Sequence, residues 1–184
     1  MDTLRTRNLV LDAVMASDTQ RVFEYCQDPA LQGYVPVPVP YTMEAAAGYT
    51  QSYAKDARWL WAIRDRLDGP LLGVIELSPL EPKSAELGSA ELGFWLGSEH
   101  RGRGIMTEAT IAVVEYAFTV GGLDHLNWCA VVGNVPSAIV ARNAGLRYEG
   151  LRRRSMPHRG VRLDGWFGSI LRTDDRAPQG GWPV

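Results

Sequence analysis

The sequence has only two cysteines, Cys26 and Cys129, which are too few for a disulfide framework and do not form a C-x-x-C pair. Its three histidines do not stand at the spacing of a metal-binding motif. No apolar run approaches the length of about 20 residues that a membrane helix needs. The residues after Met1 lack the apolar core of a secretory signal peptide. We therefore expect free thiols, no metal site, no membrane contact and a cytoplasmic location.

The charge balance gives no sign of a nucleic-acid-binding protein. The formal net charge of the 184 residues is −2, which argues against general affinity for nucleic acid. A hydrophobic content of 46% and a charged content of 22% are typical of a globular protein of ordinary composition. Since no repeat or linker divides the sequence, we expect one domain over residues 1–173, followed by a tail over residues 174–184.

The segment from Ala90 to Met106 carries the clearest functional signal. An apolar strand leads there into a cationic turn, and a long helix is predicted directly after it, over residues 107–120. A glycine-containing turn that opens a helix leaves backbone N–H groups unpaired at the positive end of the helix dipole, which suits a phosphate. Two arginines and two glycines form this turn, Arg101, Gly102, Arg103 and Gly104. The segment therefore predicts a site for a phosphorylated ligand.

Two common nucleotide motifs are excluded. A P-loop requires G-x-x-x-x-G followed by Lys and Ser or Thr, and no such string occurs in the sequence. A dinucleotide fingerprint requires G-x-G-x-x-G, but Thr107 stands where its third glycine belongs. A protein that binds another phosphorylated ligand stays open as an alternative, and ATP binding without affinity for coenzyme A would favour it.

The pattern of apolar residues predicts an alternating order of strands and helices. Strands are predicted over residues 3–14, 59–63, 71–77, 86–96, 125–132, 146–151 and 161–171, and helices over residues 17–27, 42–56, 107–120 and 134–143. The strands over 59–63 and 71–77 are predicted to form a β-hairpin, because the residues between them have a turn composition. Prolines at alternate positions between Leu31 and Tyr41 predict a stiff extended loop there. This order indicates an α/β (α+β) fold with a mixed central sheet of about seven strands and helices on both faces.

A second segment, from Asn134 to Leu146, has the signals of a short capped helix. Asn134 suits the N-cap, Pro136 the first turn and Gly145 a left-handed C-cap. These local preferences explain the asparagine without any chemistry. We keep that structural explanation beside the functional one.

Both segments together resemble one enzyme family. The string from Arg101 to Met106 is similar to the acyl-CoA signature of the GNAT acetyltransferases, Q or R followed by x-x-G-x and then G or A, although Met106 stands at the last position. The segment after Asn134 resembles the N-x-x-S helix of the branch that includes the ribosomal-protein N-terminal acetyltransferases of RimJ/RimL type. The predicted order of elements is also that of the family. The resemblance implies a sheet that is splayed between the fourth and fifth strands.

The resemblance implies acetyl-CoA as co-substrate and no metal. The strand before the turn is expected along the pantetheine arm, the turn around the diphosphate, and the second helix along the rest of the molecule. The residues assigned to coenzyme A in this way are Phe94, Trp95, Leu96, Arg101, Gly102, Arg103, Gly104, Ile105, Met106, Thr107, Asn134 and Arg142.

Transfer of an acyl group to an amine needs further groups. The amine must lose a proton before it attacks, and Glu91 is the candidate that accepts it, directly or through water. Ser137 matches the serine that acts on the leaving thiolate in related enzymes, and Tyr148 is a weaker candidate for that acid. The structural alternatives are an exposed strand carboxylate at Glu91, a helix-turn serine at Ser137 and a packed ring at Tyr148.

The acceptor is the least determined part of the prediction. We expect a primary amine, either a small molecule or a protein N-terminus, with Tyr34 and Tyr41 of the proline-rich loop as contacts; the bland alternative is a mere connector. Arginines concentrate between residues 147 and 162, which indicates either a solvated face or a site for an acidic acceptor. Acidic residues that could serve a cationic acceptor are scattered: Glu76, Glu86, Glu91 and Asp164.

The predicted function is therefore an N-acetyltransferase that moves an acetyl group from acetyl-CoA to an amine in a ternary complex. Two alternatives stay open, a non-catalytic regulatory protein that binds acyl-CoA with the same fold, and a transferase of succinyl or another acyl group. We also expect a homodimer, because homodimers are frequent in the family that the sequence resembles.

Overall fold

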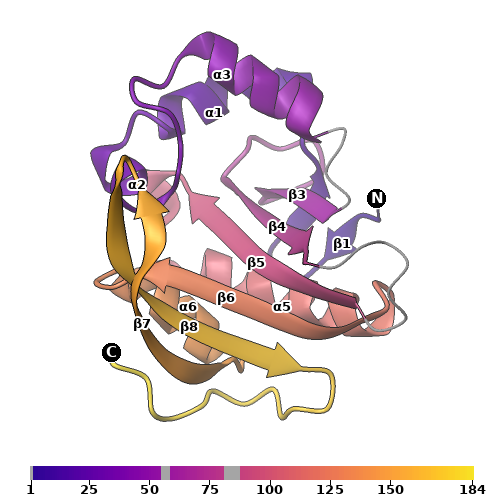
Figure 1. Ribbon diagram of the computed structural model, residues 1–184. Coiled ribbons are helices and arrows are strands. Elements are labelled where there is room, and N and C mark those ends of the chain that lie inside the picture. The colour runs from indigo at the N-terminus through magenta and orange to yellow at the C-terminus, as the bar shows by residue number, and fades with distance from the viewer. Residues whose placement is uncertain (1, 55–58, 81–87) are drawn as a thin grey trace. The chain divides into compact units, whose positions relative to one another are not determined.

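A computed structural model describes residues 2–54, 59–80 and 88–184. The strands form a mixed sheet in the order β1-β2-β3-β4-β5-β6-β8-β7 (Figure 1), which confirms the α/β class with eight strands in place of about seven. The chain divides into two compact units, and each is described by itself. Unit 1 comprises Met1–Ser78 and Gly93–Ala109, and unit 2 comprises Pro79–Leu92 and Thr110–Val184.

Unit 1 begins with a small hairpin where the sequence predicts one strand. Strands β1 (Leu4–Arg5) and β2 (Val10–Ala13) pair antiparallel. Thr6 closes the turn between them, because its N–H donates to the Leu9 carbonyl and its Oγ1 accepts from the Leu9 N–H at 2.9 Å. The prediction of one strand over 3–14 is wrong for this reason: the apolar pattern does not report the side-chain hydrogen bond that reverses the chain.

The Asp28-Pro29 pair opens a helix in addition to following one. A one-turn 3₁₀ helix, η1 (Ala16–Asp18), leads into α1 (Thr19–Tyr25), and α2 (Pro29–Tyr34) follows. Asp28 Oδ1 accepts from the Ala30 N–H at 2.9 Å, and proline at the first helical position has no N–H to satisfy. The extended loop predicted from Leu31 therefore starts later, after Tyr34.

Helix α3 (Met43–Gly48) begins as the sequence predicts. Thr42 caps it through a hydrogen bond from the Ala45 N–H to Oγ1, and the chain continues as a π-helical turn, η2 (Tyr49–Tyr53). The end of the helix predicted to residue 56 lies outside the described residues. Helices α1 and α3 lie side by side in Figure 1, and residues from both contribute to the apolar core of unit 1.

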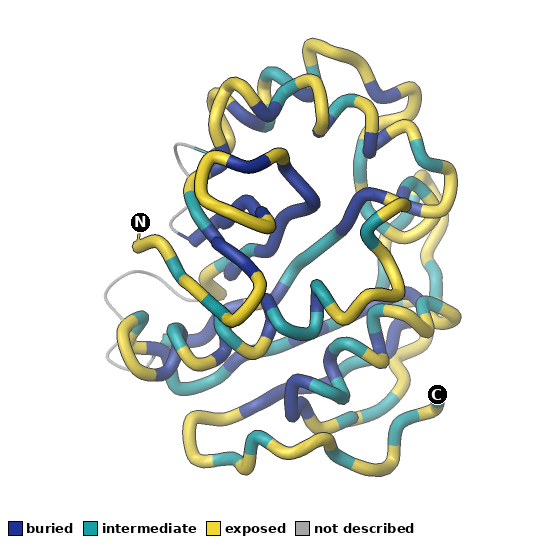
Figure 2. Tube along the Cα trace, turned by 180° about the vertical axis from the view of Figure 1, so that it is seen from behind, coloured by how far each residue is buried: buried dark blue, intermediate teal, exposed yellow. Residues whose placement is uncertain are grey.

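The strands of unit 1 confirm the predicted hairpin. β3 (Trp59–Arg64) pairs antiparallel with β4 (Gly73–Pro79), with Trp61 opposite Ile75. Every residue of β3 is buried, and the burial-coloured tube shows such dark blue runs along the strands (Figure 2). The second part of β5 (Gly88–Leu96), from Gly93 onward, also belongs to unit 1.

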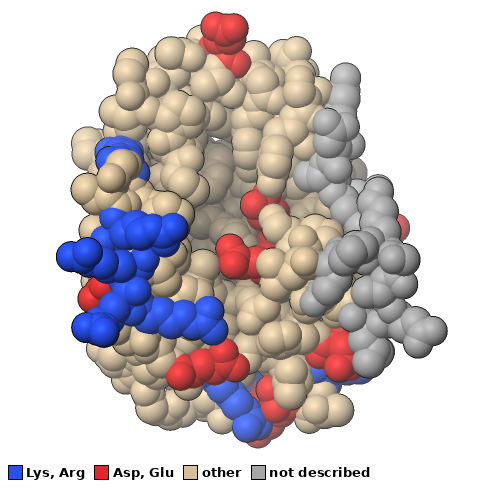
Figure 3. Space-filling view, in the orientation of Figure 1, with Lys and Arg blue, Asp and Glu red and all other residues tan. Residues whose placement is uncertain are grey.

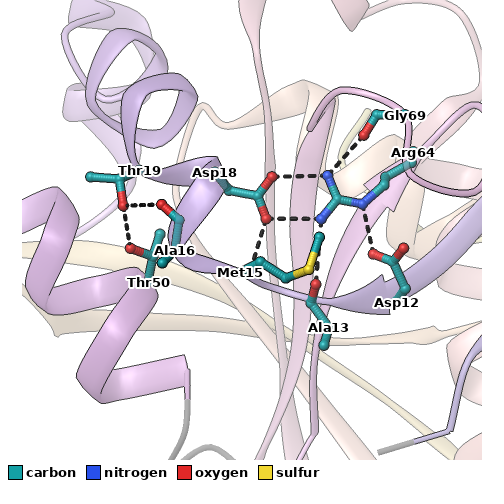
Figure 4. Close-up of polar contacts among 9 residues, drawn as sticks. All are labelled: Asp12, Ala13, Met15, Ala16, Asp18, Thr19, Thr50, Arg64 and Gly69. Atoms are coloured by element: carbon teal, nitrogen blue, oxygen red, sulfur yellow. Dashed lines mark hydrogen bonds and ion pairs between the residues drawn. The ribbon is translucent and has the colours of Figure 1, made fainter.

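A fully buried arginine ties the first strands of unit 1 to η1. The Arg64 guanidinium contacts Asp12 at 2.7 Å and Asp18 through two bonds of 2.9 and 2.8 Å (Figure 4). It also donates to the Gly69 carbonyl at 3.0 Å. Burial disfavours the charge, but the hydrogen bonds to Asp18 and Asp12 outweigh burial and raise the pKa of Arg64. Arg64 therefore stays charged and joins three segments of the chain.

Unit 2 contains the first part of β5 and three further strands. β5 pairs in parallel with β6 (Leu123–Val131), β6 pairs antiparallel with β8 (Val161–Leu171), and β8 with β7 (Arg147–His158). β7 is longer than predicted, since it continues through the arginine run, which has no alternating apolar pattern. The register of β7 shifts after Tyr148 and again after Arg152.

Two helices have the predicted positions. Helix α5 (Ile105–Thr119) follows the glycine turn, with its first residues in unit 1 and the remainder in unit 2. Helix α6 (Val135–Asn143) has Asn134 as N-cap, and Gly145 beyond it is left-handed with φ +90°.

The C-terminal segment packs against other residues of unit 2. The Trp182 ring contacts the rings of Trp128 and Tyr148 at centroid distances of 5.3 and 5.5 Å, and its Nε1 donates to the Leu146 carbonyl. The packing of Tyr148 against Trp182 agrees with the structural alternative for this tyrosine. The sequence predicts a tail over residues 174–184, and Trp182 is one of the residues through which that tail packs on the remainder of unit 2.

In the part of the chain that the structure describes, no helix combines the length and apolarity that crossing a bilayer requires. The same residues contain no group of three or more His, Cys, Asp or Glu side chains that could hold a metal ion.

Candidate functional site

The glycine turn of unit 1 presents its backbone to open space. After the short helix η3 (Ser98–His100), Gly102 and Gly104 are left-handed, with φ +71° and φ +77°, and a Cβ on either would meet nothing within 4 Å. The Glu108 N–H donates to the Gly104 carbonyl. The backbone N–H groups of the helical residues before Glu108 therefore have no acceptor within α5. The turn therefore fits an anionic group such as a diphosphate.

The two arginines of the turn differ in their contacts. Arg101 Nε and Nη2 donate to the Leu96 carbonyl at 3.1 and 3.0 Å, and Nη2 lies 2.7 Å from Asp28 Oδ2. Arg101 therefore anchors the turn to the end of β5, whereas the exposed Arg103 has no hydrogen bond or ion pair with another described residue. Met106, which departs from the family signature, is only 5% exposed and packs inward. A larger side chain at this position is thus accommodated away from the open side of the turn.

The start of α5 is fixed to the N-terminal hairpin. The Glu108 carboxylate accepts from Thr6 Oγ1 at 2.6 Å and from the backbone and side-chain nitrogens of Asn8 at 2.8 and 3.0 Å. Burial raises the pKa of Glu108, but the hydrogen bonds from Asn8 and Thr6 outweigh it and leave the pKa below its ordinary value. These bonds hold the helix N-terminus in place.

The residues predicted to line the pantetheine arm, Phe94 to Leu96, become more buried along the strand. Phe94 and Trp95 are partly exposed and Leu96 is buried. The Trp95 ring lies edge-on to the ring of Tyr25, at a centroid distance of 6.2 Å. The Tyr25 hydroxyl donates to the Leu71 carbonyl and lies 3.0 Å from His100 Nε2. Sequence analysis did not single out Tyr25 or His100 as neighbours of this strand, since only the fold joins them.

In unit 2, the candidate acid Ser137 has an unexpected partner. Trp128 Nε1 donates to Ser137 Oγ at 3.0 Å, and the Ser137 N–H donates to Asn134 Oδ1 at 3.4 Å. Asn134 therefore acts as the N-cap, as the local signals predict. Because the serine oxygen accepts from the indole, its own proton can point to another acceptor. Sequence reasoning missed Trp128, although its place on a strand before the N-x-x-S helix was a usable signal.

The candidate base Glu91 lies at the end of a strand ladder. The β5/β6 register ends at Glu91 opposite Asn127, while both strands continue, to Leu96 and to Val131. The end of this ladder is where the predicted splay between the fourth and fifth strands would begin. Glu91 is exposed and forms a hydrogen bond with Cys129. Burial and the Glu91 charge raise the pKa of the Cys129 thiol to about 12, so that thiol stays protonated.

The other predicted contacts are divided between surface and interior. Arg142 donates to the backbone carbonyl of Val184 at 3.1 Å and to Asn143 Oδ1. Tyr34 is exposed, whereas Tyr41 is 6% exposed and belongs to the core of unit 1. Burial is the main cause that raises the pKa of Tyr41, and the neighbouring Cys26 raises it further.

Strands β7 and β8 form a hairpin rich in arginine. Arginine side chains gather over it in Figure 3, and we call this pair of strands the arginine hairpin after its exposed arginines: Arg147, Arg152, Arg153, Arg154, Arg159 and Arg162. Arg152 stacks on the Phe167 ring at 4.2 Å, and Arg162 Nη1 donates to the Arg154 carbonyl. The Arg154 N–H donates to Asp164. The hairpin therefore has an ordered backbone and a strongly positive surface.

A strand that leads through an open glycine turn into a helix N-terminus defines a class of proteins that bind a phosphorylated ligand. Residues 8–147 match the family described as acetyltransferase (GNAT) domain. The chain is 34% identical to the putative ribosomal N-acetyltransferase YdaF of Bacillus subtilis over 58% of its length and 57% of that relative. It is 32% identical to the probable N-acetyltransferase YjcK of the same organism over 69% of both chains.

A solved structure shares the fold. It is that of RimL, described as a ribosomal L7/L12 alpha-N-protein acetyltransferase in complex with coenzyme A, with a TM-score of 0.79 at 20% identity over 92% of this chain and 98% of that one. The chain is an N-acetyltransferase of the acetyltransferase (GNAT) family.

Proposed function

We propose that the protein transfers the acetyl group of acetyl-CoA to the N-terminal amine of an acidic protein or peptide. The exposed arginine hairpin of unit 2 carries this proposal, because a dense positive surface attracts an acceptor whose residues are negatively charged. The names of YdaF and RimL point in the same direction, toward ribosomal proteins as acceptors. A cationic acceptor such as a polyamine would be repelled by the hairpin.

For coenzyme A, the proposal assigns the diphosphate to the amides of the turn from Arg101 to Thr107. The left-handed glycines and the open space around them support this role. Phe94, Trp95 and Leu96 would line the pantetheine arm, and Asn134 and Arg142 the remainder. We assign this activity to one domain over residues 1–173, with residues 174–184 as a tail.

The proposed reaction is a direct transfer in a ternary complex. The ammonium first loses a proton to Glu91 or to water, and the free amine then attacks the thioester carbonyl. The carbon–nitrogen bond forms and the carbon–sulfur bond breaks. The thiolate takes the proton of the Ser137 hydroxyl, and the attacking nitrogen gives up its second proton, which restores that hydroxyl and leaves a neutral amide. The Trp128 hydrogen bond supports this role, because it occupies a lone pair of Ser137 Oγ and leaves the hydroxyl proton available.

Two finer expectations belong to the same proposal. A ribosomal-protein acceptor would place the enzyme in the cytoplasm. A homodimer is expected from the family resemblance, and a measurement of the molar mass in solution tests this expectation.

The test measures thiol release from acetyl-CoA and from succinyl-CoA with two peptides. Both begin with Ser, and one continues with Glu residues and the other with Lys residues. We expect faster transfer from acetyl-CoA to the Glu-containing peptide, and a large loss of kcat in Ser137→Ala with unchanged binding of acetyl-CoA. Ser17→Ala, which removes an exposed serine hydroxyl from η1 in unit 1, is the matched serine control.

Other outcomes would contradict the proposal. Binding of acetyl-CoA without transfer to any amine would identify a regulatory acyl-CoA-binding protein. Faster turnover of succinyl-CoA would identify a transferase of that acyl group, and preference for the Lys-containing peptide would refute the acidic acceptor.

A further inference from the structure

Unit 1 contains a row of rings that begins beside the glycine turn. The rings of His100 and Tyr25 lie 5.9 Å apart, and those of Tyr25 and Trp95 lie 6.2 Å apart. The side chains of Trp95 and Tyr49 form a hydrogen bond. Tyr49 stacks on Tyr53 with a centroid distance of 5.4 Å and an interplanar angle of 15°. Five aromatic rings from four separate segments of the chain are thus in contact one after another.

The row ends at a carboxylate. The Tyr53 hydroxyl donates to Glu76 Oε2 at 2.9 Å, and Ser78 Oγ donates to Oε1 at 3.3 Å. Glu76 is only partly exposed on β4, between the buried residues Ile75 and Leu77. Each oxygen therefore has one neutral donor and keeps a lone pair for a further partner.

Gly93 on β5 makes room for this carboxylate. A Cβ at Gly93 would lie 3.3 Å from Glu76 Cγ and 3.4 Å from Oε1, so any larger side chain there would press on the carboxyl group. The position of Glu76 is thus set by Tyr53, Ser78 and the absence of a side chain opposite it.

The charge of Glu76 is not neutralised by a described residue. None of the ion pairs between described residues includes Glu76. Burial and the Glu76 charge raise the pKa of Tyr53, so its phenol stays a donor at neutral pH. A partly buried carboxylate that already accepts a phenol hydrogen bond and has no cationic partner among the described residues is a favourable setting for an ammonium group.

We propose that Glu76 and Tyr53 bind the ammonium group of the acceptor, with Tyr49 holding the Tyr53 ring in place. The inference rests on the proposed function, because it supplies the subsite for the N-terminal amine of the acceptor. Glu76 is an acceptor-binding residue here, and proton removal stays with Glu91 or water. The acidic residues of the acceptor and its terminal ammonium are then recognised by different groups of opposite charge.

The kinetic test uses the Ser-initiated, Glu-containing peptide and acetyl-CoA. We expect Glu76→Gln to raise the KM for the peptide by on the order of tenfold, because a charge-assisted contact is lost while the shape is kept. Tyr53→Phe should raise it less, and both variants should keep the wild-type KM for acetyl-CoA. Glu44→Gln, which removes an exposed carboxylate from the first turn of α3, is the matched control and should match the wild type.

A binding measurement separates this inference from the proposed function. By calorimetry in the presence of coenzyme A, the wild type should bind the free peptide more tightly than the same peptide with a formylated N-terminus, and Glu76→Gln should lose that preference. A variant that keeps the preference, or that loses only thermal stability, would overturn the assignment of Glu76. A wild type that shows the preference but transfers no acetyl group would refute the proposed function and leave the ammonium subsite supported.

Discussion

The charged side chains of the two units are used in opposite ways. In unit 1, Arg64 is buried and Arg101 is tied to Asp28 and the Leu96 carbonyl. In unit 2, the arginine hairpin leaves its guanidinium groups at the surface. Arginine is the same residue in both places, so the difference lies in whether the fold surrounds it with acceptors. A buried arginine holds segments together, whereas an arginine at the surface can also contact a partner.

The largest effect is expected at Arg64. Arg64→Met leaves the buried Asp18 and the partly buried Asp12 without a cation, and breaking a buried ion pair in this way costs about 3–5 kcal/mol. We expect a large drop in the free energy of unfolding in urea. Arg66→Ala removes an exposed arginine two residues away, whose side chain is 68% exposed, and should leave stability unchanged. If both variants have the same free energy of unfolding, Arg64 does not have the structural role that distinguishes it from the exposed arginines of unit 2.

A smaller effect is expected at Arg101. In Arg101→Ala the turn loses its bonds to the Leu96 carbonyl and its ion pair with Asp28, and a partly exposed contact of this kind contributes about 1 kcal/mol. Stability should fall modestly and the KM for acetyl-CoA should rise, because the glycine backbone is less well held. The stability control is Arg103→Ala, which removes an exposed arginine of the same turn. A rise in KM for Arg103→Ala alone would mean that charge, and not anchoring, matters at the turn.

The comparison also shows which parts of the molecule a sequence can reveal. The glycine turn, the capped helix after Asn134 and the hairpin of β3 and β4 depend on neighbours in the chain, and all were predicted from local patterns. The start of α2 and the turn at Thr6 depend on single side-chain hydrogen bonds, which apolar periodicity does not register. The prolines after Leu31 obscured the helix that Asp28 begins.

Contacts between distant segments were beyond prediction for a different reason. Arg64 stands at the end of an apolar strand, and nothing local indicates that Asp12 and Asp18 surround it. Likewise, the sequence shows Glu76 as one of several scattered acidic residues, and only the structure shows its hydrogen bond with Tyr53. The extension of β7 through consecutive arginines was missed because strand pairing with β8, and not an alternating pattern, stabilises it.

Within the arginine hairpin, a small effect on stability is expected at Arg152. Its guanidinium lies 4.2 Å from the centroid of the Phe167 ring. A cation–π contact at an exposed site contributes about 0.5–1 kcal/mol, so Arg152→Gln should lower the free energy of unfolding by that amount. Phe167→Leu, which removes the ring, should abolish the difference between Arg and Gln at position 152. A full double-mutant cycle with no coupling would show that the stacking has no energetic role.

The smallest effect on stability, and the clearest effect on the acceptor, is expected at Arg153. Its side chain is exposed, so Arg153→Glu should change the free energy of unfolding by no more than about 0.5 kcal/mol. The KM for the Glu-containing peptide should nevertheless rise severalfold at low ionic strength, and the increase should shrink as added salt screens the charges. The KM for acetyl-CoA should stay at the wild-type value. Since Arg66→Glu places the same reversed charge in unit 1, an equal rise in its peptide KM would show that the peptide responds to overall charge and not to the hairpin.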